Sequence, residues 1–254
     1  MWLRVYLLMV SLIGGAAAAA EVNYLVIEEG TEPFQYRVGN RPMGMITEIM
    51  REVASQSGIE INPVFFTSMA QRRASINQYQ HRNWVFFGAR EWYQDSVRRA
   101  ASYSSLPLFN YKVHVLSRKG QNPRFDSISS LKNKRVVLIQ GYTYDGFADT
   151  LAQAAGALKM EILKAAGHDE AMSLFLAGKA DYYLIYKPRG TYLLHKQGHR
   201  LEEFDFVSLP QVKPVKVYLM FDKHMPDSLK QSLNKGVAFL RRSGRLNGIL
   251  RKYL

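Results

Sequence analysis

The chain has 254 residues, of which 47% are hydrophobic and 22% are charged, and its 34 Lys and Arg against 21 Asp and Glu give a net charge of +13. This composition is typical of a globular protein rather than a disordered chain, and the length allows one large domain or two smaller ones. Because the chain contains no cysteine, a disulfide framework, a thiolate metal site, a cysteine nucleophile and a lipid anchor on cysteine are all excluded.

Residues 1–20 have the pattern of a secretory signal peptide. One basic residue, Arg4, precedes an apolar run over residues 5–13, and small residues at 18–20 come directly before Glu21. The run is shorter than the roughly 20 apolar residues that cross a bilayer, so we expect cleavage rather than anchoring. The sequence therefore predicts an exported protein of a bacterial periplasm, and export argues against nucleic acid as the partner of the positive charge.

The first part of the exported chain alternates apolar strand patterns with helical patterns. Strands are expected at 24–27, 59–66 and 84–87, with helices at 46–54 and 69–79 between them. Pro63 inside the second strand favours a position at the sheet edge, because proline lacks a backbone N–H. This β-α-β-α-β order predicts a parallel sheet covered by helices.

The same theme occurs a second time after an extended stretch at 108–116. Strands are expected at 135–139, 160–163 and 181–186, and helices at 144–155 and 169–177, the latter capped by Asp169. A strand at 216–221 and helices at 228–240 and 246–253 end the chain.

These patterns predict an α/β protein of two lobes joined by two extended crossover strands. We expect residues 21–112 and 213–254 to form one lobe and residues 113–212 the other, with a hinge near 108–116 and 205–215. In open α/β sheets, ligands bind beyond the carboxyl ends of the strands. The loops at 28–34, 88–92, 140–144 and 186–189 are therefore expected to face one another across a ligand cleft.

Five segments, in this order, resemble the family 3 periplasmic solute-binding proteins, the extracytoplasmic receptors for polar amino acid uptake. They are Pro33-Phe34 with Gly44, Tyr103-Ser104 with Pro107-Leu108, residues 131–143, Ala177-Gly178-Lys179-Ala180-Asp181, and residues 233–253. The resemblance implies the periplasmic-binding-protein-like fold and a ligand that closes the two lobes like a hinge. A ligand that touches both lobes favours their closed arrangement, which a membrane partner can then recognise.

The resemblance also implies an arginine that clamps a ligand carboxylate. Arg98 and Arg99 both stand near the expected position, with Arg98 preferred, and Arg90 follows a strand end. A guanidinium offers two parallel donors that match a carboxylate. Gly141 and Thr143 lead toward a helix whose backbone N–H groups suit an anion, although Thr143 also fits ordinary N-capping.

Glu28 stands where the family often carries an acidic residue, which implies pairing with a cationic group of the ligand, and Phe66 is expected on the cleft floor. The chain departs from the family at Tyr186, where amino acid binders carry a carboxylate for the ligand's ammonium group. Tyr186 and the following Lys187 favour a neutral or anionic ligand. A Tyr186→Asp substitution is accordingly expected to improve the binding of standard amino acids.

No motif for catalysis, a cofactor or a metal stands out. His195 and His199 are four residues apart, but Gly198 between them and the lack of a third ligand nearby argue against a metal site. The expected function is a receptor that captures a small polar solute, an amino acid or related carboxylate, for the membrane permease of an ABC transporter. Two alternatives stay open: a dehydratase of cyclic acids that uses Glu28 or Glu29 as the acid, and a receptor for a sensor kinase.

Overall fold

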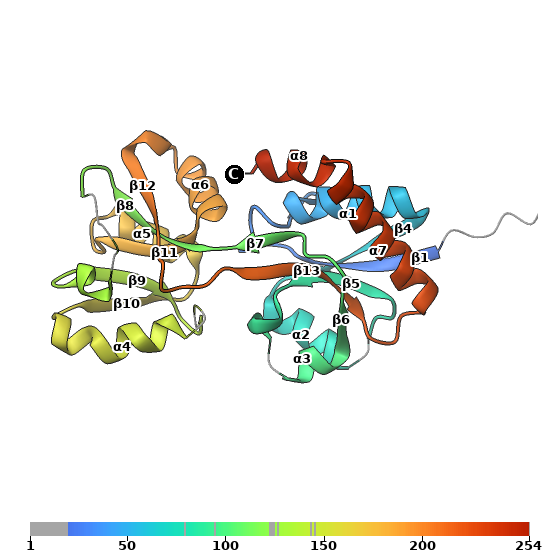
Figure 1. The fold of residues 1–254 in the computed structure, drawn as a ribbon, viewed down its shortest axis with the longest axis horizontal. Helices are drawn as coiled ribbons and strands as arrows, with labels where there is room; N and C mark the ends of the chain where they lie inside the picture. Colours follow the sequence, from blue (N-terminus) through green and yellow to red (C-terminus); the bar gives the residue numbers. More distant parts are fainter. Residues whose placement is uncertain are drawn as a thin grey trace, which may run out of the picture.

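The computed structural model describes residues 20–78, 80–93, 95–121, 125, 127–142, 144 and 146–253. Two α/β lobes lie at opposite ends of an elongated molecule and are joined by two extended segments (Figure 1). The predicted signal peptide falls outside the described residues except for Ala20, which begins the first strand. Among the described residues, no helix combines the length and apolar character needed to cross a membrane.

The sheet of the first lobe mixes parallel and antiparallel strands. Its order is β4 (Ile59–Phe66), β1 (Ala20–Ile27), β5 (Trp84–Gly88), β13 (Val215–Asp222) and β6 (Ala101–Tyr103), and β7 (Phe109–Tyr111) also pairs with β13. β4, β1 and β5 are parallel, whereas β13 runs antiparallel to its neighbours. The strand that contains Pro63 is at the sheet edge, as the missing backbone donor predicts.

Helices cover both faces of this sheet (Figure 1). The helical elements of the first lobe are α1 (Met45–Ser57), α2 (Met69–Asn77), a 3-10 helix (Arg90–Trp92), α3 (Asp95–Ala100), α7 (Asp227–Arg242) and α8 (Arg245–Arg251), and a short hairpin joins β2 (Tyr36–Val38) to β3 (Arg41–Met43). The predicted apolar face of α1, which includes Ile46, Ile49 and Val53, is fully buried. α1 and α7 approach closely at Gly236, where an added Cβ would lie 2.8 Å from the carbonyl oxygen of Val53.

The sheet of the second lobe has the order β10 (Glu161–Ala165), β9 (Arg135–Ile139), β11 (Tyr182–Tyr186), β8 (Val113–Arg118) and β12 (Phe204–Ser208). β10, β9 and β11 are parallel, and β8 is antiparallel to both of its neighbours. The helices of this lobe are α4 (Phe147–Leu158), α5 (His168–Leu176) and α6 (Lys187–Lys196), with 3-10 helices at Ile128–Leu131 and Leu201–Glu203.

The two connections between the lobes run side by side. β7 continues into β8 through Lys112, and the return segment at residues 209–214 joins β12 to β13. β8 pairs with β12 as far as His114 and Ser208, and β7 pairs with β13 from Tyr111 and Val215 onward. The pairing of strands is therefore interrupted between the two lobes, at Lys112 and residues 209–214.

Three local predictions were wrong. The helix expected from residue 144 begins at Phe147, and its N-cap is Gly146 with a φ of 79°. Asp169 lies inside the first turn of α5 rather than capping it, because Gly167 is the N-cap. The loop expected after Tyr186 is the first turn of α6, where Pro188 occupies a starting position that needs no backbone donor.

Candidate functional site

The segments that follow the strand ends of the two sheets meet between the lobes. β1 ends at Ile27 and is followed by the loop that holds Gly30 and Phe34. β11 ends at Tyr186 in the other lobe and leads directly into α6, which holds Arg189. Contacts of Tyr186 with Phe34 and of Arg189 with Gly30 join these two segments. The segments after these two strand ends are therefore in direct contact across the lobes.

Five aromatic side chains form the base of this region, and we call them the ring cluster: Phe34, Phe87, Phe109, Tyr111 and Tyr186. Tyr186 stacks on Tyr111 at a centroid distance of 4.4 Å and on Phe34 at 5.6 Å. Although Tyr186 belongs to a strand of the second lobe, it is buried in the hydrophobic core of the first. The ring cluster is therefore a packing contact between the two lobes, as is the contact of Tyr36 with Tyr192, at a centroid distance of 6.2 Å.

Arg189 is the buried cation of this region. Its side chain is only 6% exposed, and Nη1 donates a hydrogen bond of 3.1 Å to the carbonyl oxygen of Gly30. The guanidinium carbon lies 5.1 Å from the ring centroid of Phe34, which is a cation–π contact. Nε is buried and has no hydrogen-bond partner among the described residues. A positive charge with an unused donor thus stands at the contact between the lobes.

A polar aromatic group lies on the second lobe near Arg189. His168 Nδ1 is hydrogen-bonded to the Tyr183 hydroxyl, and the ring of Tyr142 meets His168 edge-on at 5.6 Å. Burial holds the pKa of His168 well below its usual range, and the charge of Arg189 lowers that pKa further. His168 is therefore neutral at neutral pH, and its buried Nε2 has no described partner.

Two large apolar surfaces stay open at the edge of this region. Trp92 is 39% exposed and meets Tyr111 of the ring cluster edge-on at 4.9 Å. Tyr142, on the opposite lobe, is 47% exposed. Both residues follow strand ends, the position at which α/β proteins bind ligands.

A second buried arginine, Arg72 of α2, lies within the first lobe. Its guanidinium is 4.0 Å from the centroid of Phe86 and 5.4 Å from that of Tyr93. Burial lowers the pKa of Arg72, and its three guanidinium nitrogens have no hydrogen-bond partner among the described residues. The faces of Phe86 and Tyr93 lie against this charge, and Tyr93 opposes the lowering of its pKa.

The residues that the sequence singled out occupy different positions. Glu28 is bound to Arg37 at 2.6 Å, so a cation of the protein already neutralises its carboxylate. Phe66 is 5% exposed at the end of β4 and belongs to the core of the first lobe, with its ring edge-on to His81. Tyr186 lies in the ring cluster between the lobes.

The three candidate arginines lie near one another in the first lobe. Arg90 lies with its guanidinium carbon 5.0 Å from the ring centroid of Tyr103, and Arg98 and Arg99 are exposed on α3. Burial raises the pKa of the Tyr103 hydroxyl, and the charges of Arg90 and Arg98 oppose that rise. Gly141 lies in a turn well before α4 and so is not at a helix N-terminus, and Thr143 lies outside the described residues.

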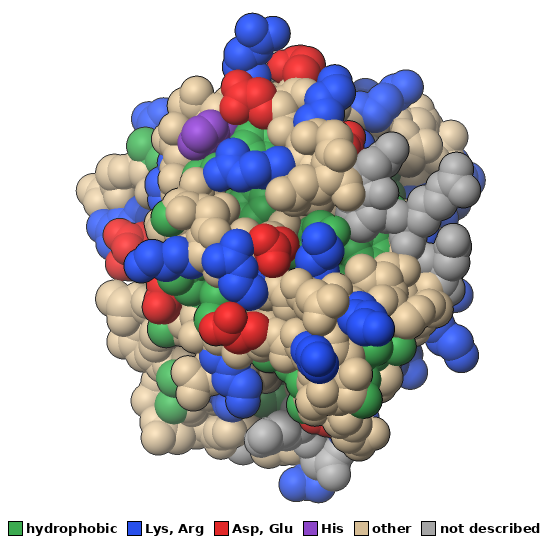
Figure 2. Space-filling model, turned by 90° about the vertical axis from the view of Figure 1, so that its left-hand side faces the viewer, with side chains coloured by type: hydrophobic (Ala, Val, Ile, Leu, Met, Phe, Trp, Pro, Cys, Tyr) green, Lys and Arg blue, Asp and Glu red, His purple; other side chains and the backbone are tan. Residues whose placement is uncertain are grey.

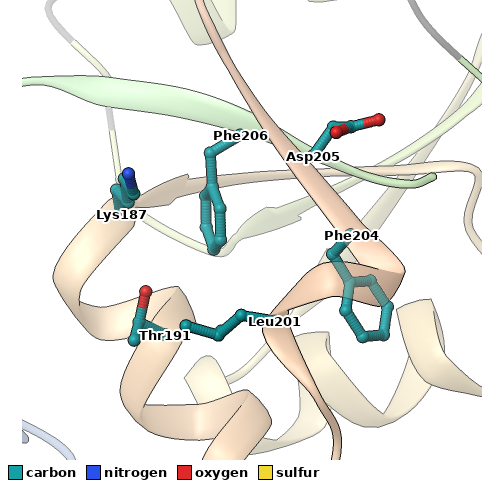
Figure 3. A pocket seen from close by; sticks show the side chains of 6 residues that line it. All are labelled: Lys187, Thr191, Leu201, Phe204, Asp205 and Phe206. Atoms are coloured by element: carbon teal, nitrogen blue, oxygen red, sulfur yellow. The ribbon is translucent and has the colours of Figure 1, made fainter.

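Two hollows are lined by residues of the second lobe and of the return connection. One, of about 250 Å³, is lined by Lys187, Thr191, Leu201, Phe204, Asp205 and Phe206 (Figure 3). The other, of about 510 Å³, is lined by Ser127, Ile128, Gly146, Phe147, Thr150 and Gln211. In Figure 3 the Asp205 carboxylate points away from the Lys187 amine, so the first hollow does not combine these charges.

On the face that Figure 2 shows, the second lobe carries basic and acidic side chains side by side. Figure 2 views this end of the molecule and shows Lys and Arg side chains spread between acidic ones. Within the described part of the chain, no group of three or more His, Asp or Glu side chains is placed to hold a metal ion.

Comparison with known proteins places this geometry in context. Residues 25–254 match the family model described as bacterial extracellular solute-binding proteins, family 3. Substrate-binding domain 2 of GlnP from Lactococcus lactis, in its open conformation, is similar with a TM-score of 0.69 and 17% identity, covering 94% of this chain and 96% of that one. A search of curated protein sequences gave no match.

Two further solved structures have the same overall arrangement. The periplasmic VFT2 domain of BvgS from Bordetella pertussis has a TM-score of 0.67 and 15% identity, covering 92% of this chain and 93% of that one. A Streptococcus mutans structure, from work on glutathione import through GshT and the cystine ABC importer TcyBC, has a TM-score of 0.69 and 17% identity, covering 92% and 94%. At these identities the likeness concerns the fold, which is periplasmic-binding-protein-like.

Proposed function

Because the chain belongs to family 3 of the bacterial extracellular solute-binding proteins, we propose that it captures a small polar solute, an amino acid or a related carboxylate, between its two lobes. The observation that carries this proposal is the contact of Arg189 with the Gly30 carbonyl oxygen, beside the stacking of Tyr186 on Phe34. These contacts join the segments that follow facing strand ends, where α/β proteins bind ligands.

The paired connections supply the movement that capture requires. β7 and β8 on one side and β12 and β13 on the other leave an unpaired stretch at Lys112 and residues 209–214. We propose that the lobes bend there and that a solute held by both lobes favours the closed arrangement. The ligand can shift this equilibrium only by the difference in its affinity for the two arrangements.

Export and delivery complete the proposal. The expected signal peptide at residues 1–20 sends the protein to the periplasm, where the closed form presents its solute to the permease of an ABC transporter. GlnP of L. lactis, whose substrate-binding domain shares this fold, supports uptake as the context.

A sensory role is the second candidate, and a specific likeness favours it. A VFT2 domain of BvgS and a histidine kinase sensor domain with similarity to periplasmic binding proteins both share the fold over most of this chain. In that role the closed form signals to a sensor kinase and no solute crosses the membrane.

Ligand screening tests the shared part of both candidates. Amino acids and carboxylates, pooled by charge class, are added to the purified protein, and its melting temperature is measured. We expect one class to raise it, because a ligand that binds only the folded state stabilises that state. Uptake of the labelled solute by cells with and without the gene then separates transport from sensing. A chemical change of the solute during incubation would contradict both candidates and favour an enzyme.

A further inference from the structure

The guanidinium of Arg189 uses only one of its edges in the described structure. Nη1 donates to the Gly30 carbonyl oxygen, whereas Nε is buried without a partner and no described hydrogen bond reaches Nη2. Nε and Nη2 form the edge of a guanidinium that matches both oxygens of a carboxylate. A buried donor without an acceptor is unfavourable, so this edge is suited to an acceptor from outside the chain.

Two acidic side chains close to the segments that meet at Arg189 are paired with other cations. Glu28 is paired with Arg37, and Asp169 accepts a hydrogen bond of 3.2 Å from Lys196. This hydrogen bond raises the pKa of Lys196, and the charge of Glu32 adds to that rise. No described ion pair joins Arg189 to a carboxylate, so its charge favours an anionic ligand over one that brings an ammonium group.

Exposed aromatic rings of both lobes contact residues on which the charge of Arg189 acts. Trp92 contacts Tyr111 of the ring cluster, and Tyr142 contacts His168. The charge of Arg189 acts on Tyr111 as well as on His168, so both contacts lie within its electrostatic reach. The exposed rings of Trp92 and Tyr142 belong to opposite lobes and suit a flat, weakly polar body between them.

We propose that Arg189 binds the carboxylate of a flat organic anion, an aromatic or unsaturated carboxylate without an ammonium group, through the edge formed by Nε and Nη2. The body of this anion lies between Trp92 and Tyr142. This inference rests on the proposed function, because it names the class of solute that the same cleft captures.

Calorimetric titration with matched probes tests this class. The probes are 4-hydroxybenzoate and trans-cinnamate, their neutral amides, and the zwitterions L-tyrosine and L-phenylalanine. We expect at least one carboxylate to bind, and we expect its neutral amide to bind at least about tenfold more weakly. The reason is that a neutral hydrogen bond replaces the charge-assisted one. Equal binding of acid and amide, tighter binding of a zwitterion, or no binding of either carboxylate overturns the inference.

Variants locate the binding group. Arg189→Gln is expected to weaken binding of the carboxylate about tenfold or more. The matched control Arg200→Gln, at a side chain that is 79% exposed on the same lobe, leaves the affinity unchanged. If Arg189→Gln does not fold, Arg189→Lys is used instead, because lysine keeps the charge without the planar guanidinium. We expect Arg189→Lys to weaken binding of the carboxylate as well. Unchanged affinity in a folded Arg189 variant overturns the inference.

The two proposals fail in different ways. If the general screen finds a zwitterionic or neutral solute whose affinity does not depend on Arg189, the inference fails while capture between the lobes stands. If no solute of any charge class binds, the proposed function fails together with it.

Discussion

Arg189 of the second lobe donates from Nη1 to the backbone carbonyl oxygen of Gly30 in the first lobe, at 3.1 Å. The two residues are 159 positions apart in the chain, yet each follows the carboxyl end of a parallel strand. This bond ties the segment after β11 to the segment after β1, at the place where the two lobes meet.

The first prediction concerns the arginine clamp that the sequence suggested. For a clamp on α3, the alternative to one at Arg189, we expect Arg98→Ala or Arg99→Ala to abolish ligand binding. Thermal stability should stay nearly unchanged, because both side chains are exposed on α3. Binding is measured by calorimetry with the solute that the screen identifies, and stability by thermal unfolding. If neither variant changes the affinity, the clamp is not on α3.

The second prediction concerns Tyr186 and differs from the expectation based on sequence. Because Tyr186 is 6% exposed and stacked in the ring cluster, Tyr186→Asp places a carboxylate among aromatic rings instead of at an open site. We expect it to destabilise the protein by about 3 kcal/mol or more and to give no gain in amino acid binding. Tyr186→Phe, which keeps the ring, is the matched control and should cost less than about 1.5 kcal/mol. A stable Tyr186→Asp protein with improved amino acid binding would contradict the placement of Tyr186 in the ring cluster.

The third prediction is a pH dependence that comes from His168. Burial, with Arg189 nearby, lowers the pKa of folded His168, and its other neighbours, Tyr183 and Tyr142, bring no negative charge. The unfolded chain binds a proton at this residue near about pH 6.5, so it binds more protons than the folded state as the pH falls. The free energy of unfolding should therefore decrease between about pH 7 and pH 5.

Substitution assigns this effect to its residue. His168→Gln should remove part of the decrease in stability on acidification, whereas His195→Gln, at an exposed position of α6, should leave it in place. Denaturant unfolding curves at a series of pH values measure both. The same pH dependence in the His168 variant as in the parent protein would show that other groups cause it.

The fourth prediction concerns the attachment of the C-terminal helix. Glu48 of α1 accepts hydrogen bonds from Lys252, at 2.6 Å, and from the Tyr253 hydroxyl. Partial burial raises the pKa of Glu48, but these hydrogen bonds outweigh burial and lower it overall. We expect Glu48→Gln to lower the free energy of unfolding by about 1 kcal/mol and the melting temperature by roughly 2–4 °C. Amide exchange in α8 should also become faster.

Glu52 offers a matched control on the same helix. It is paired with Arg245 at 3.2 Å, and both of these side chains are more than two-fifths exposed. Glu52→Gln should therefore change the melting temperature less than Glu48→Gln does. A larger effect at Glu52 would mean that the anchor of α8 is at its start rather than at its end.

Much of the fold follows from local pattern. The spacing of apolar residues predicted the strand at Arg135–Ile139 and the buried face of α1. The edge position of β4 was predicted because Pro63 lacks a backbone donor. The first turn of α6 was missed although Pro188 was a signal for a helix start. The division of the chain at 112 and 213 stays a prediction.

The site was less predictable, because it depends on contacts between distant segments. Nothing in the local sequence distinguishes Arg189, which bonds across the lobes, from Arg90 or Arg98, which act on Tyr103. The pairing of Glu28 with Arg37 depends on a hairpin that the apolar pattern did not reveal. Tyr186 was identified as a departure from the family, but its packing into the other lobe's core was visible only in the fold.

Small-angle X-ray scattering tests the central claim most directly. The radius of gyration is measured for the purified protein without and with a saturating amount of the solute found in the ligand screen. Because the two connections allow bending between the lobes, we predict a smaller radius with the solute, together with a rise in melting temperature. A bound solute that stabilises the protein but leaves the radius of gyration unchanged would contradict capture by closure of the lobes.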